Sequence, residues 1–382
     1  MIAPQYHPIV GGYERAAERL SGGLVARGCE VTVVTDRRNP AWPAGEFRDG
    51  VEVRRLWCVW RPRVHLLTAL SSLAAFLLGE GRRFQVWHAH DFSPHARLAI
   101  FIGRIVRRPV VLKLTTSGRQ GVLARTSAAG ASARLAGALL RRVTAVVALT
   151  EETSQEAVQA GVPAARVHIL GNGVDADTYR PQTPEERSAL KAALGFAGRR
   201  AFIAVGRLIG DKNIDGLLEA WGSARSAIEP DWLLIVVGEG EQRASLARKA
   251  STLGLSDSVR FVGEQKDVHL WLGASDVYVT SSNREGLSNT LLEAMASGLP
   301  SVATRVSGVP QLIDAEGAGI GVDIGSVGGL ADAIIRMASD AAAQRHQGAR
   351  ARAVIEASYT VSRVAELHER LYRQLQSGED GA

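Results

Sequence analysis

The chain has 382 residues, too many for one ordinary hydrophobic core, so we expect two domains of roughly 150–200 residues each. Its composition, with 46% hydrophobic and 22% charged residues and a mean hydropathy of +0.01, is typical of a soluble globular protein. The longest apolar stretch, residues 66–79, is broken by serines and is shorter than the roughly 20 residues that cross a bilayer. We therefore expect no transmembrane segment.

Charge is distributed unevenly along the chain. Residues 1–180 hold 24 Lys/Arg against 14 Asp/Glu, whereas the remainder holds 21 against 25. A basic first half suits an anionic partner, such as phosphates, a polyprenyl-phosphate lipid or an anionic membrane surface, and it equally suits a solvated arginine-rich surface. Nucleic acid is disfavoured, because the basic residues are not interleaved with aromatic ones and match no nucleic-acid motif.

The cysteines and histidines give no metal pattern. Cys29 and Cys58 have neither the spacing of a disulfide framework nor that of a metal site, and no secretory signal is visible at the start. We expect reduced thiols and a cytoplasmic location, with the inner face of the plasma membrane as the place of any peripheral docking. His88 and His90 lie two residues apart without a carboxylate to complete a ligand set, so neither a metal nor another cofactor is expected.

Short apolar, β-branched runs alternate with longer amphipathic segments, which predicts parallel sheets with helical crossovers. Each run is mostly apolar rather than alternating, as expected for strands that are covered on both faces. The strands expected in chain order are 31–35, 86–89, 110–114, 145–149, 167–170, 202–205, 233–237, 259–262, 277–280 and 301–304.

The first residues raise a question about the first strand. A doubly wound domain places this strand centrally, and here only Met1 to Pro4 remain of it before the pair Gly11-Gly12 begins a helix. We therefore expect the natural product to start several residues upstream of Met1. The glycine pair lets a ligand approach the backbone at a helix N-terminus, but it lacks the third glycine of the dinucleotide fingerprint.

The segment 60–83 has two interpretations. An apolar run from Val64 to Leu78 follows Trp60 and has two arginines near each end, at positions 61, 63, 82 and 83. This pattern is typical of a peripheral membrane-docking segment, and equally of a core helix with basic ends.

The domain boundary is expected at 171–175, where glycines flank Asn172, with a polar, proline-containing segment continuing to Pro184. We assign residues 1–175 to an N-terminal domain and 176–358 to a C-terminal domain. Residues from about 359 to 376 carry apolar side chains at helical spacing, which predicts a terminal amphipathic helix.

Two cations follow a predicted strand in the second domain. Arg207 and Lys212 lie directly after strand 202–205 and just before a helix, which is a favourable place to bind phosphate. Lysine is rare in this chain, five against 40 arginines, so a lysine here favours a compact point charge. Two surface cations on a turn would give the same pattern.

The strongest chemical signal lies in residues 284–300. Ser288 or Asn289 is a good helix N-cap, and Gly298 followed by Pro300 is a good stop. The apolar residues of this helix cluster on one side of the helical wheel, so Glu293 is expected to point away from the core.

An anion site is expected at the start of this helix. Free N–H groups near residues 288–290 fit a diphosphate. One carboxylate, Glu285 or Glu293, would accept hydrogen bonds from sugar hydroxyls and the other from a ribose. A solvated helix with incidental glutamates is the alternative.

Taken together and in this order, the motifs resemble glycosyltransferase family 4, whose members have the GT-B fold of two Rossmann-like α/β domains facing across a cleft. The resemblance implies a retaining enzyme that moves a hexose from a nucleotide-diphosphate sugar to a glycan, lipid-linked or small-molecule acceptor, as in polysaccharide biosynthesis. The matching segments cover nearly the whole chain: the Gly11-Gly12 loop, residues 25–35, 88–91 and 172–175, the Arg207/Lys212 pair, and the helix with Glu285 and Glu293.

The resemblance also implies roles for single residues. Arg207 and Lys212 would hold the donor diphosphate and stabilise the leaving group, Glu285 would contact the transferred sugar, and Glu293 the nucleotide ribose. The N-terminal domain would bind the acceptor and the C-terminal domain the donor, and the helix at 359–376 would pack back on the N-terminal domain. Further donor-binding positions are Gly11, Gly12, Gly238, Gly240, Val262, Gly286, Leu287, Ser288 and Asn289.

The chain departs from the family after strand 110–114, where a histidine often faces the donor sugar. Thr115 stands there, so its hydroxyl, Lys113, or His90 from the neighbouring strand end is expected to take that place. Lys113, Thr115 and Thr116 are assigned to the acceptor side. Three alternatives stay open: a nucleotide-sugar epimerase of the same fold, a non-catalytic nucleotide-sugar-binding protein, and a nicotinamide-dependent oxidoreductase, which the missing glycine fingerprint disfavours.

Overall fold

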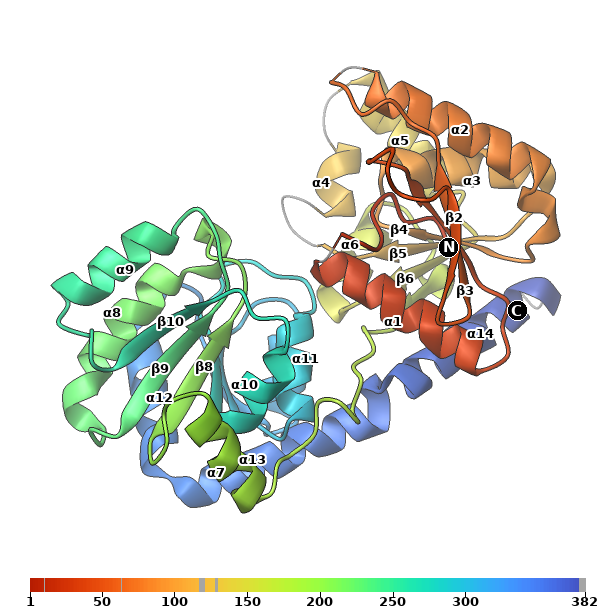
Figure 1. The fold of residues 1–382 in the computed structure, drawn as a ribbon. Helices are drawn as coiled ribbons and strands as arrows, with labels where there is room; N and C mark the ends of the chain where they lie inside the picture. The colour runs from red at the N-terminus through yellow and green to blue at the C-terminus, as the bar shows by residue number, and fades with distance from the viewer. Residues whose placement is uncertain (10, 63, 117–120, 128–129, 378–382) are drawn as a thin grey trace. The chain divides into compact units, whose positions relative to one another are not determined.

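The computed structural model describes all residues except 10, 63, 117–120, 128–129 and 378–382. The chain divides into two compact units (Figure 1). Unit 1 comprises residues 1–173 together with 361–382, and unit 2 comprises residues 174–360. The chain leaves unit 1 inside the segment 171–175, two residues before the expected domain end. Among the described residues, no helix is both long and apolar enough to span a bilayer.

Unit 1 is built on strands in two hydrogen-bonded groups, ordered β1-β3-β2 and β4-β5-β6-β7. Ile2 forms isolated parallel bridges with Val34 in β1 and with Ala89 in β4, so the first residues of the chain lie between the two groups. The pairs are parallel except that β2 runs antiparallel to β3. The strands are β1 (Thr32–Asp36), β2 (Gly45–Arg48), β3 (Val51–Leu56), β4 (Trp87–His90), β5 (Val110–Leu114), β6 (Ala145–Ala148) and β7 (Val167–Ile169).

Helices cover both faces of this sheet. Successive residues of a strand point to opposite faces, and in the central strands both sets are mostly apolar. On one face Leu112 of β5 is buried beneath α2, α3 and α5 (Figure 1). On the other face Val111 is buried with Leu371 of α14, and α14 also packs along α1. The helices are α1 (Gly12–Ala26), α2 (His65–Gly79), α3 (Pro94–Val106), α4 (Val122–Ser127), α5 (Ala131–Leu140), α6 (Glu151–Gln159) and α14 (Val361–Ser377), with the 3-10 turns η1 (Gly81–Arg83) and η3 (Ala164–Arg166).

Unit 2 contains a parallel six-stranded sheet of order β10-β9-β8-β11-β12-β13. Its core includes Phe202, Trp221 and Trp232, which are fully buried where α8 packs on the sheet. Successive strands first add on one side of β8 and then, from β11 on, on its other side, so the strand order reverses between β8 and β11. The strands are β8 (Arg200–Val205), β9 (Trp232–Val237), β10 (Val259–Gly263), β11 (Val277–Thr280), β12 (Ser301–Thr304) and β13 (Gly319–Val322).

Helices complete unit 2 on both faces of its sheet, with α8 and α12 side by side on one of them (Figure 1). The helices are α7 (Pro184–Ala193), α8 (Ile214–Ala224), α9 (Arg243–Thr252), α10 (Val268–Ala274), α11 (Asn289–Ala296), α12 (Val327–Ser339) and α13 (Ala341–Val354), with short segments η4 (Gly210–Lys212), η5 (Arg225–Ala227), η6 (Pro310–Ala315) and η7 (Ile355–Tyr359).

The α/β class with two Rossmann-like units is confirmed, and all ten predicted strands are present with ends within two residues of the expected ones. Three strands were not predicted: β2, β3 and β13. β3 alternates buried and partly exposed residues and contains three charged ones, of which Arg55 is buried, and β2 is mostly exposed, so neither gives the continuous apolar run of a doubly covered strand. β13 contains two glycines in four residues, which weakens any strand signal.

Candidate active site

The carboxyl ends of β8 and β11 form the place where ligands bind in open α/β sheets, because the strand order reverses there. β8 ends at Val205 and is followed by the loop 206–213, which contains η4. β11 ends at Thr280 and is followed by the loop 281–288, which leads into α11. The two segments that the sequence singled out for phosphate binding are therefore neighbours in unit 2.

Lys212 and Glu285 join these two loops directly. Lys212 Nζ donates to Glu285 Oε1 at 2.5 Å, and Ser282 Oγ donates to Glu285 Oε2 at 2.9 Å. The two charged side chains are 19% and 16% exposed, so the pair is partly shielded from water. An ammonium beside a carboxylate on this edge can exchange its partner for the phosphates of an incoming ligand.

Backbone and side-chain contacts hold the same two loops in register. Ser281 Oγ donates to the carbonyl oxygens of Lys212 and Asn213 at 3.0 and 2.9 Å, and Asn283 N donates to Asp211 O at 2.8 Å. Asn213 adopts a left-handed conformation (φ 49°) and caps α8 by accepting from Gly216 N at 3.3 Å. The position of Lys212 is thus set by the backbone around it.

The start of α11 is capped as predicted. Ser288 is the N-cap, and its Oγ accepts from Leu291 N. Thr290 in the first turn is hydrogen-bonded to the Tyr278 hydroxyl at 2.9 Å, and burial raises the pKa of Tyr278. These contacts fix the first turn of α11 on β11, next to the loop that carries Glu285.

The prediction that Glu293 points away from the core is wrong, because the side of α11 that faces away from the sheet is covered as well. Glu293 is 1% exposed, and every residue from 291 to 296 is buried. The cause is a second layer, in which α13, η7 and α10 pack on α11. A solvated helix with incidental glutamates is therefore excluded.

Arg207 is not brought into contact with the Lys212–Glu285 pair. Its side chain is exposed, and within the described part of the chain it makes neither a hydrogen bond nor an ion pair. Its backbone lies in the loop after β8, between Gly206 N, which donates to Val237 O at 3.0 Å, and Leu208 N, which donates to Glu239 O at 2.8 Å.

Gly238 and Gly240 let the loop after β9 approach the loop after β8. A Cβ at Gly238 (φ 138°) would lie 1.9 Å from Gly206 O, and one at Gly240 would lie 2.4 Å from Leu208 O. Gly238 N also donates to the carbonyl of Gly263, which follows Val262 in β10, at 2.8 Å. The loops after β8, β9 and β10 therefore form one layer of backbone along the candidate site.

Unit 1 carries the remaining predicted residues at the carboxyl ends of its own strands. Gly11 is the N-cap of α1, Gly12 is its exposed first residue, and the Tyr13 hydroxyl donates to His90 O at 3.3 Å. Thr115 and Thr116 directly follow β5 and are half-buried. Ser117 and Gly118, which belong to the same predicted run, lie outside the described residues.

His90 and Lys113 lie side by side in the register of β4 and β5, beneath α14. His88 stacks on His90 with ring centroids 4.7 Å apart and on His368 of α14 at 5.6 Å. His88 Nδ1 is hydrogen-bonded to the Tyr372 hydroxyl at 2.5 Å. His88 is thus a packed core histidine, and neither His368 nor Tyr372 was predicted, since their part in this cluster depends on where α14 docks.

Burial keeps this histidine cluster neutral. Burial is the largest cause and the nearby charge of Lys113 a smaller one; together they hold the pKa of His88 and His90 well below the ordinary 6.5 and lower that of His368 to about 3. Lys113 is 1% exposed, and burial lowers its pKa from 10.5 to about 8. Neither ring nitrogen of His90 has a hydrogen-bond partner among the residues that the structure describes. Among the residues that the structure describes, no carboxylate pairs with Lys113.

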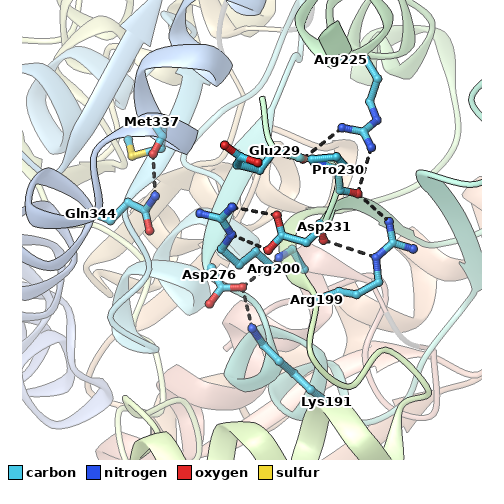
Figure 2. Close-up of polar contacts among 11 residues, drawn as sticks. Lys191, Arg199, Arg200, Arg225, Glu229, Pro230, Asp231, Asp276, Met337 and Gln344 are labelled. Atoms are coloured by element: carbon cyan, nitrogen blue, oxygen red, sulfur yellow. Dashed lines mark hydrogen bonds and ion pairs between the residues drawn. The ribbon is translucent and has the colours of Figure 1, made fainter. Parts of the chain in front are cut away.

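The amino edge of the unit 2 sheet carries charged pairs of a different kind (Figure 2). Arg200 at the start of β8 makes two hydrogen bonds of 2.7 Å to Asp231, just before β9. Lys191 of α7 donates at 2.8 Å to Asp276, just before β11. A shallow hollow beside α7 is lined by Lys191 and Arg200. Because these charges are mutually paired and lie opposite the carboxyl edge, we assign this network to the stability of the sheet.

Two family models match the chain. Residues 11–173 match the glycosyl transferase 4-like domain, and residues 186–354 match glycosyl transferases group 1. The chain belongs to glycosyltransferase family 4. It is a transferase of the GT-B fold.

Curated relatives of this family 4 glycosyltransferase include enzymes with different acceptors. It is 24% identical to an N-acetyl-α-D-glucosaminyl L-malate synthase of Bacillus anthracis, over 96% of this chain and 94% of that protein. It is 28% identical to a GDP-mannose-dependent α-(1-6)-phosphatidylinositol monomannoside mannosyltransferase of Mycolicibacterium smegmatis, over 82% of each chain.

Solved structures share the fold of this glycosyltransferase at low sequence identity. The structure of Anabaena HepE in complex with UDP and glucose matches with a TM-score of 0.79 and 19% identity, over 98% of each chain. At this level of identity the likeness concerns the fold.

Proposed function

We propose that this glycosyltransferase moves a hexose from a nucleoside-diphosphate sugar to a glycan, lipid-linked or small-molecule acceptor, with retention of anomeric configuration. The observation that carries this proposal is the Lys212–Glu285 pair on the carboxyl edge of unit 2, next to the N-terminus of α11. A helix N-terminus and an ammonium together favour the two negative charges of a diphosphate. Glu285 is then released to accept hydrogen bonds from sugar hydroxyls.

In the proposed reaction, the bond between the anomeric carbon and the β-phosphate oxygen breaks while an acceptor oxygen bonds to the same carbon from the same face. The acceptor proton passes to the departing phosphate oxygen, so no protein nucleophile and no metal is required. Lys212 and the amides near Ser288 stabilise the charge that builds up on the leaving diphosphate. Arg207, exposed on the neighbouring loop, is the second cation proposed for this role.

The other predicted residues complete the proposal. Glu293 would bind the ribose, and the backbone layer formed by Gly238, Gly240 and Val262 would line the nucleotide pocket. In unit 1 the α1 N-terminus and His90 would face the donor sugar, and Lys113, Thr115 and Thr116 the acceptor.

The relatives use or bind different nucleotides, so they support more than one candidate donor. HepE is solved with UDP and glucose, and the Mycolicibacterium smegmatis relative is GDP-mannose-dependent, so we propose a UDP- or GDP-hexose. We further propose a cytoplasmic enzyme of polysaccharide biosynthesis that works on the inner face of the plasma membrane.

The test measures donor binding and transfer separately. Thermal-shift titration with UDP-, GDP-, ADP- and dTDP-sugars identifies the donor, and Lys212→Ala should then weaken diphosphate binding and lower transfer by about 100-fold or more. Lys249→Ala is the matched control, because Lys249 also pairs with two carboxylates in unit 2 but lies on α9. Normal transfer by Lys212→Ala, or consumption of donor to an epimer without acceptor, would contradict the proposal.

A further inference from the structure

We infer that unit 1 docks on an anionic lipid bilayer through the outer faces of α2 and α3. We call this surface the α2–α3 face. Its apolar residues are Trp57, Trp60, Val64, Leu67, Leu78, Phe101 and Ile105, and its cations are Arg61, Arg82, Arg104 and Arg107.

The outer side of α2 presents no charge to solvent. Beyond His65, the helix contains only apolar residues, glycine, serine and threonine. Its inner side buries Leu73 and Leu77 in the core, whereas Leu67 is 69% and Leu78 54% exposed. Surface helices of globular proteins normally place charged residues on the outer side. One side of α2 thus belongs to the core, as the core-helix interpretation of segment 60–83 predicted, and the other side is open to solvent.

The neighbouring helix continues the apolar surface. α3 packs against α2 (Figure 1), and its Phe101 and Ile105 are 55% and 61% exposed while Ile100 and Ile102 are buried. In unit 2, by contrast, Leu253 and Ile324 are the large hydrophobic residues exposed among the described ones, and they lie on separate segments. Unit 1 also exposes Phe47, Leu135, Val158 and Ile169 on separate elements, but most of its exposed large hydrophobic residues lie on α2, on α3 and in the segment that leads into α2.

Trp60, which precedes α2, contacts two neighbouring side chains and remains exposed to solvent. It lies under the Arg38 guanidinium at 4.5 Å and against the ring of His65 at 4.1 Å, yet remains half-exposed. His65 is itself tied to the buried carboxylate of Asp36, with Nε2 3.4 Å from Oδ2. An indole fixed at a surface, with a second exposed one at Trp57, suits the polar–apolar boundary of a bilayer, where tryptophan is enriched.

The charge around these residues is positive and unopposed. Between Asp91 and Glu151 the sequence contains no aspartate or glutamate but ten lysines and arginines. Arg61, Arg82, Arg104 and Arg107 are exposed and make no ion pair with any described residue. Arginines at this position can bind lipid phosphates while the apolar side chains enter the headgroup region. Arg63 lies outside the described residues.

These features favour a bilayer over a second copy of the chain. A two-fold dimer through the α2–α3 face would bring its own arginines together, and the acidic residue beside this face, Glu80 at the C-cap of α2, is already paired with Arg54 and Arg83. An anionic bilayer instead supplies both the apolar interior and the negative charge. The inference deepens the proposed function, because a lipid-linked acceptor would be met at this surface, but lipid binding itself does not depend on that function.

Vesicle flotation tests the inference on the full chain. We expect it to float with vesicles of phosphatidylcholine mixed with an equal amount of phosphatidylglycerol, and not with phosphatidylcholine alone. The apolar variant Leu67→Ser/Phe101→Ser/Ile105→Ser and the charge variant Arg61→Gln/Arg104→Gln/Arg107→Gln should each lower the ratio of bound to free protein by about tenfold. The control variant Leu253→Ser/Ile324→Ser, in unit 2, should float like wild type.

Sedimentation and nucleoside-diphosphate binding are measured on the same samples. All changed side chains are exposed, so unchanged melting temperatures and unchanged UDP or GDP binding show that the variants are folded. Flotation of both α2–α3 variants at wild-type level would overturn the inference, as would a wild-type dimer that the apolar variant dissociates. Flotation without any nucleotide-sugar binding would contradict the proposed function and leave the docking surface intact.

Discussion

Replacing Lys113 with methionine should stabilise unit 1, although it removes a candidate acceptor-binding residue. Burial lowers the pKa of this lysine from 10.5 to about 8, and no carboxylate in the described part of the chain pairs with it. At about 1.4 kcal/mol per pH unit, this difference of about 2.5 corresponds to about 3 kcal/mol of unfolding free energy lost to the buried charge. Methionine has a similar length and no charge, so the variant should recover about that amount at pH 7.

The pH dependence identifies the cause. Below pH 8 the ammonium is charged in both the folded and the unfolded chain, so the full cost is present. Above pH 8 the folded state releases its proton first, and the cost falls as the pH approaches 10.5. Between about pH 8 and 10.5, the unfolding free energy of the wild type should therefore rise relative to that of Lys113→Met, and the two values should converge.

Urea titrations at several pH values, followed by near-ultraviolet circular dichroism, measure this difference. Lys249→Met is the control, because it removes surface ion pairs and should change the unfolding free energy by less than about 1 kcal/mol. Transfer activity of Lys113→Met should fall while stability rises, as expected for a residue that serves function at the expense of stability. The reasoning is refuted if Lys113→Met is no more stable than wild type at pH 7, or if their difference is the same above pH 8.

Three further perturbations test other parts of the structure. The pKa of His368 is lowered to about 3, so on acidification the folded state binds its proton at a lower pH than the unfolded state does. The free energy of unfolding of unit 1 should therefore fall by about 1.4 kcal/mol per pH unit below about pH 6.5, and an acid titration of His368→Phe should show a shallower fall. Gly238→Ala would place a Cβ against backbone and should lower the melting temperature by several degrees and abolish donor binding. Gly254→Ala also lies at a positive φ (68°) but has open space around it, so it should cost only about 1 kcal/mol; thermal shifts with and without nucleotide compare the two variants. Glu285→Gln should lower turnover about 100-fold while nucleoside-diphosphate affinity, measured by calorimetry, stays equal or rises, because Lys212 loses its ionic partner; an equal loss of affinity and turnover would contradict this.

The strands could be predicted where helices cover both faces of the sheet. The runs at 110–114 and 277–280 are buried throughout and were assigned with their observed ends, because a doubly covered strand leaves mostly apolar residues in consecutive positions; Lys113 is the charged exception. β3 could not be found in this way, since three of its six residues are charged: Glu52 and Arg54 are partly exposed, and Arg55 is buried. The short antiparallel β2 exists only as the partner of β3.

The candidate site was predictable as separate motifs but not as an arrangement. Lys212 and Glu285 were identified individually, yet their contact follows from β8 and β11 being neighbours, which depends on the strand order of the whole sheet. For Glu293, the sequence led to the wrong expectation that the side chain lies away from the core. A helical wheel describes one interface, and it does not show that α13 and η7 cover the opposite side of α11.

The path of the chain through Gly173 and Val361 has a practical consequence. Unit 2 is inserted into unit 1, and its two ends are adjacent, since Val174 forms a bridge with Thr360 and donates from its N–H to Tyr359 O at 2.8 Å. The ends left in unit 1 are adjacent as well, because a Cβ at Gly173 would lie 2.9 Å from Val361 Cα. We therefore expect that residues 174–360 can be excised as one piece and unit 1 resealed by a short glycine-containing turn, so that each unit can be expressed and tested for folding by itself.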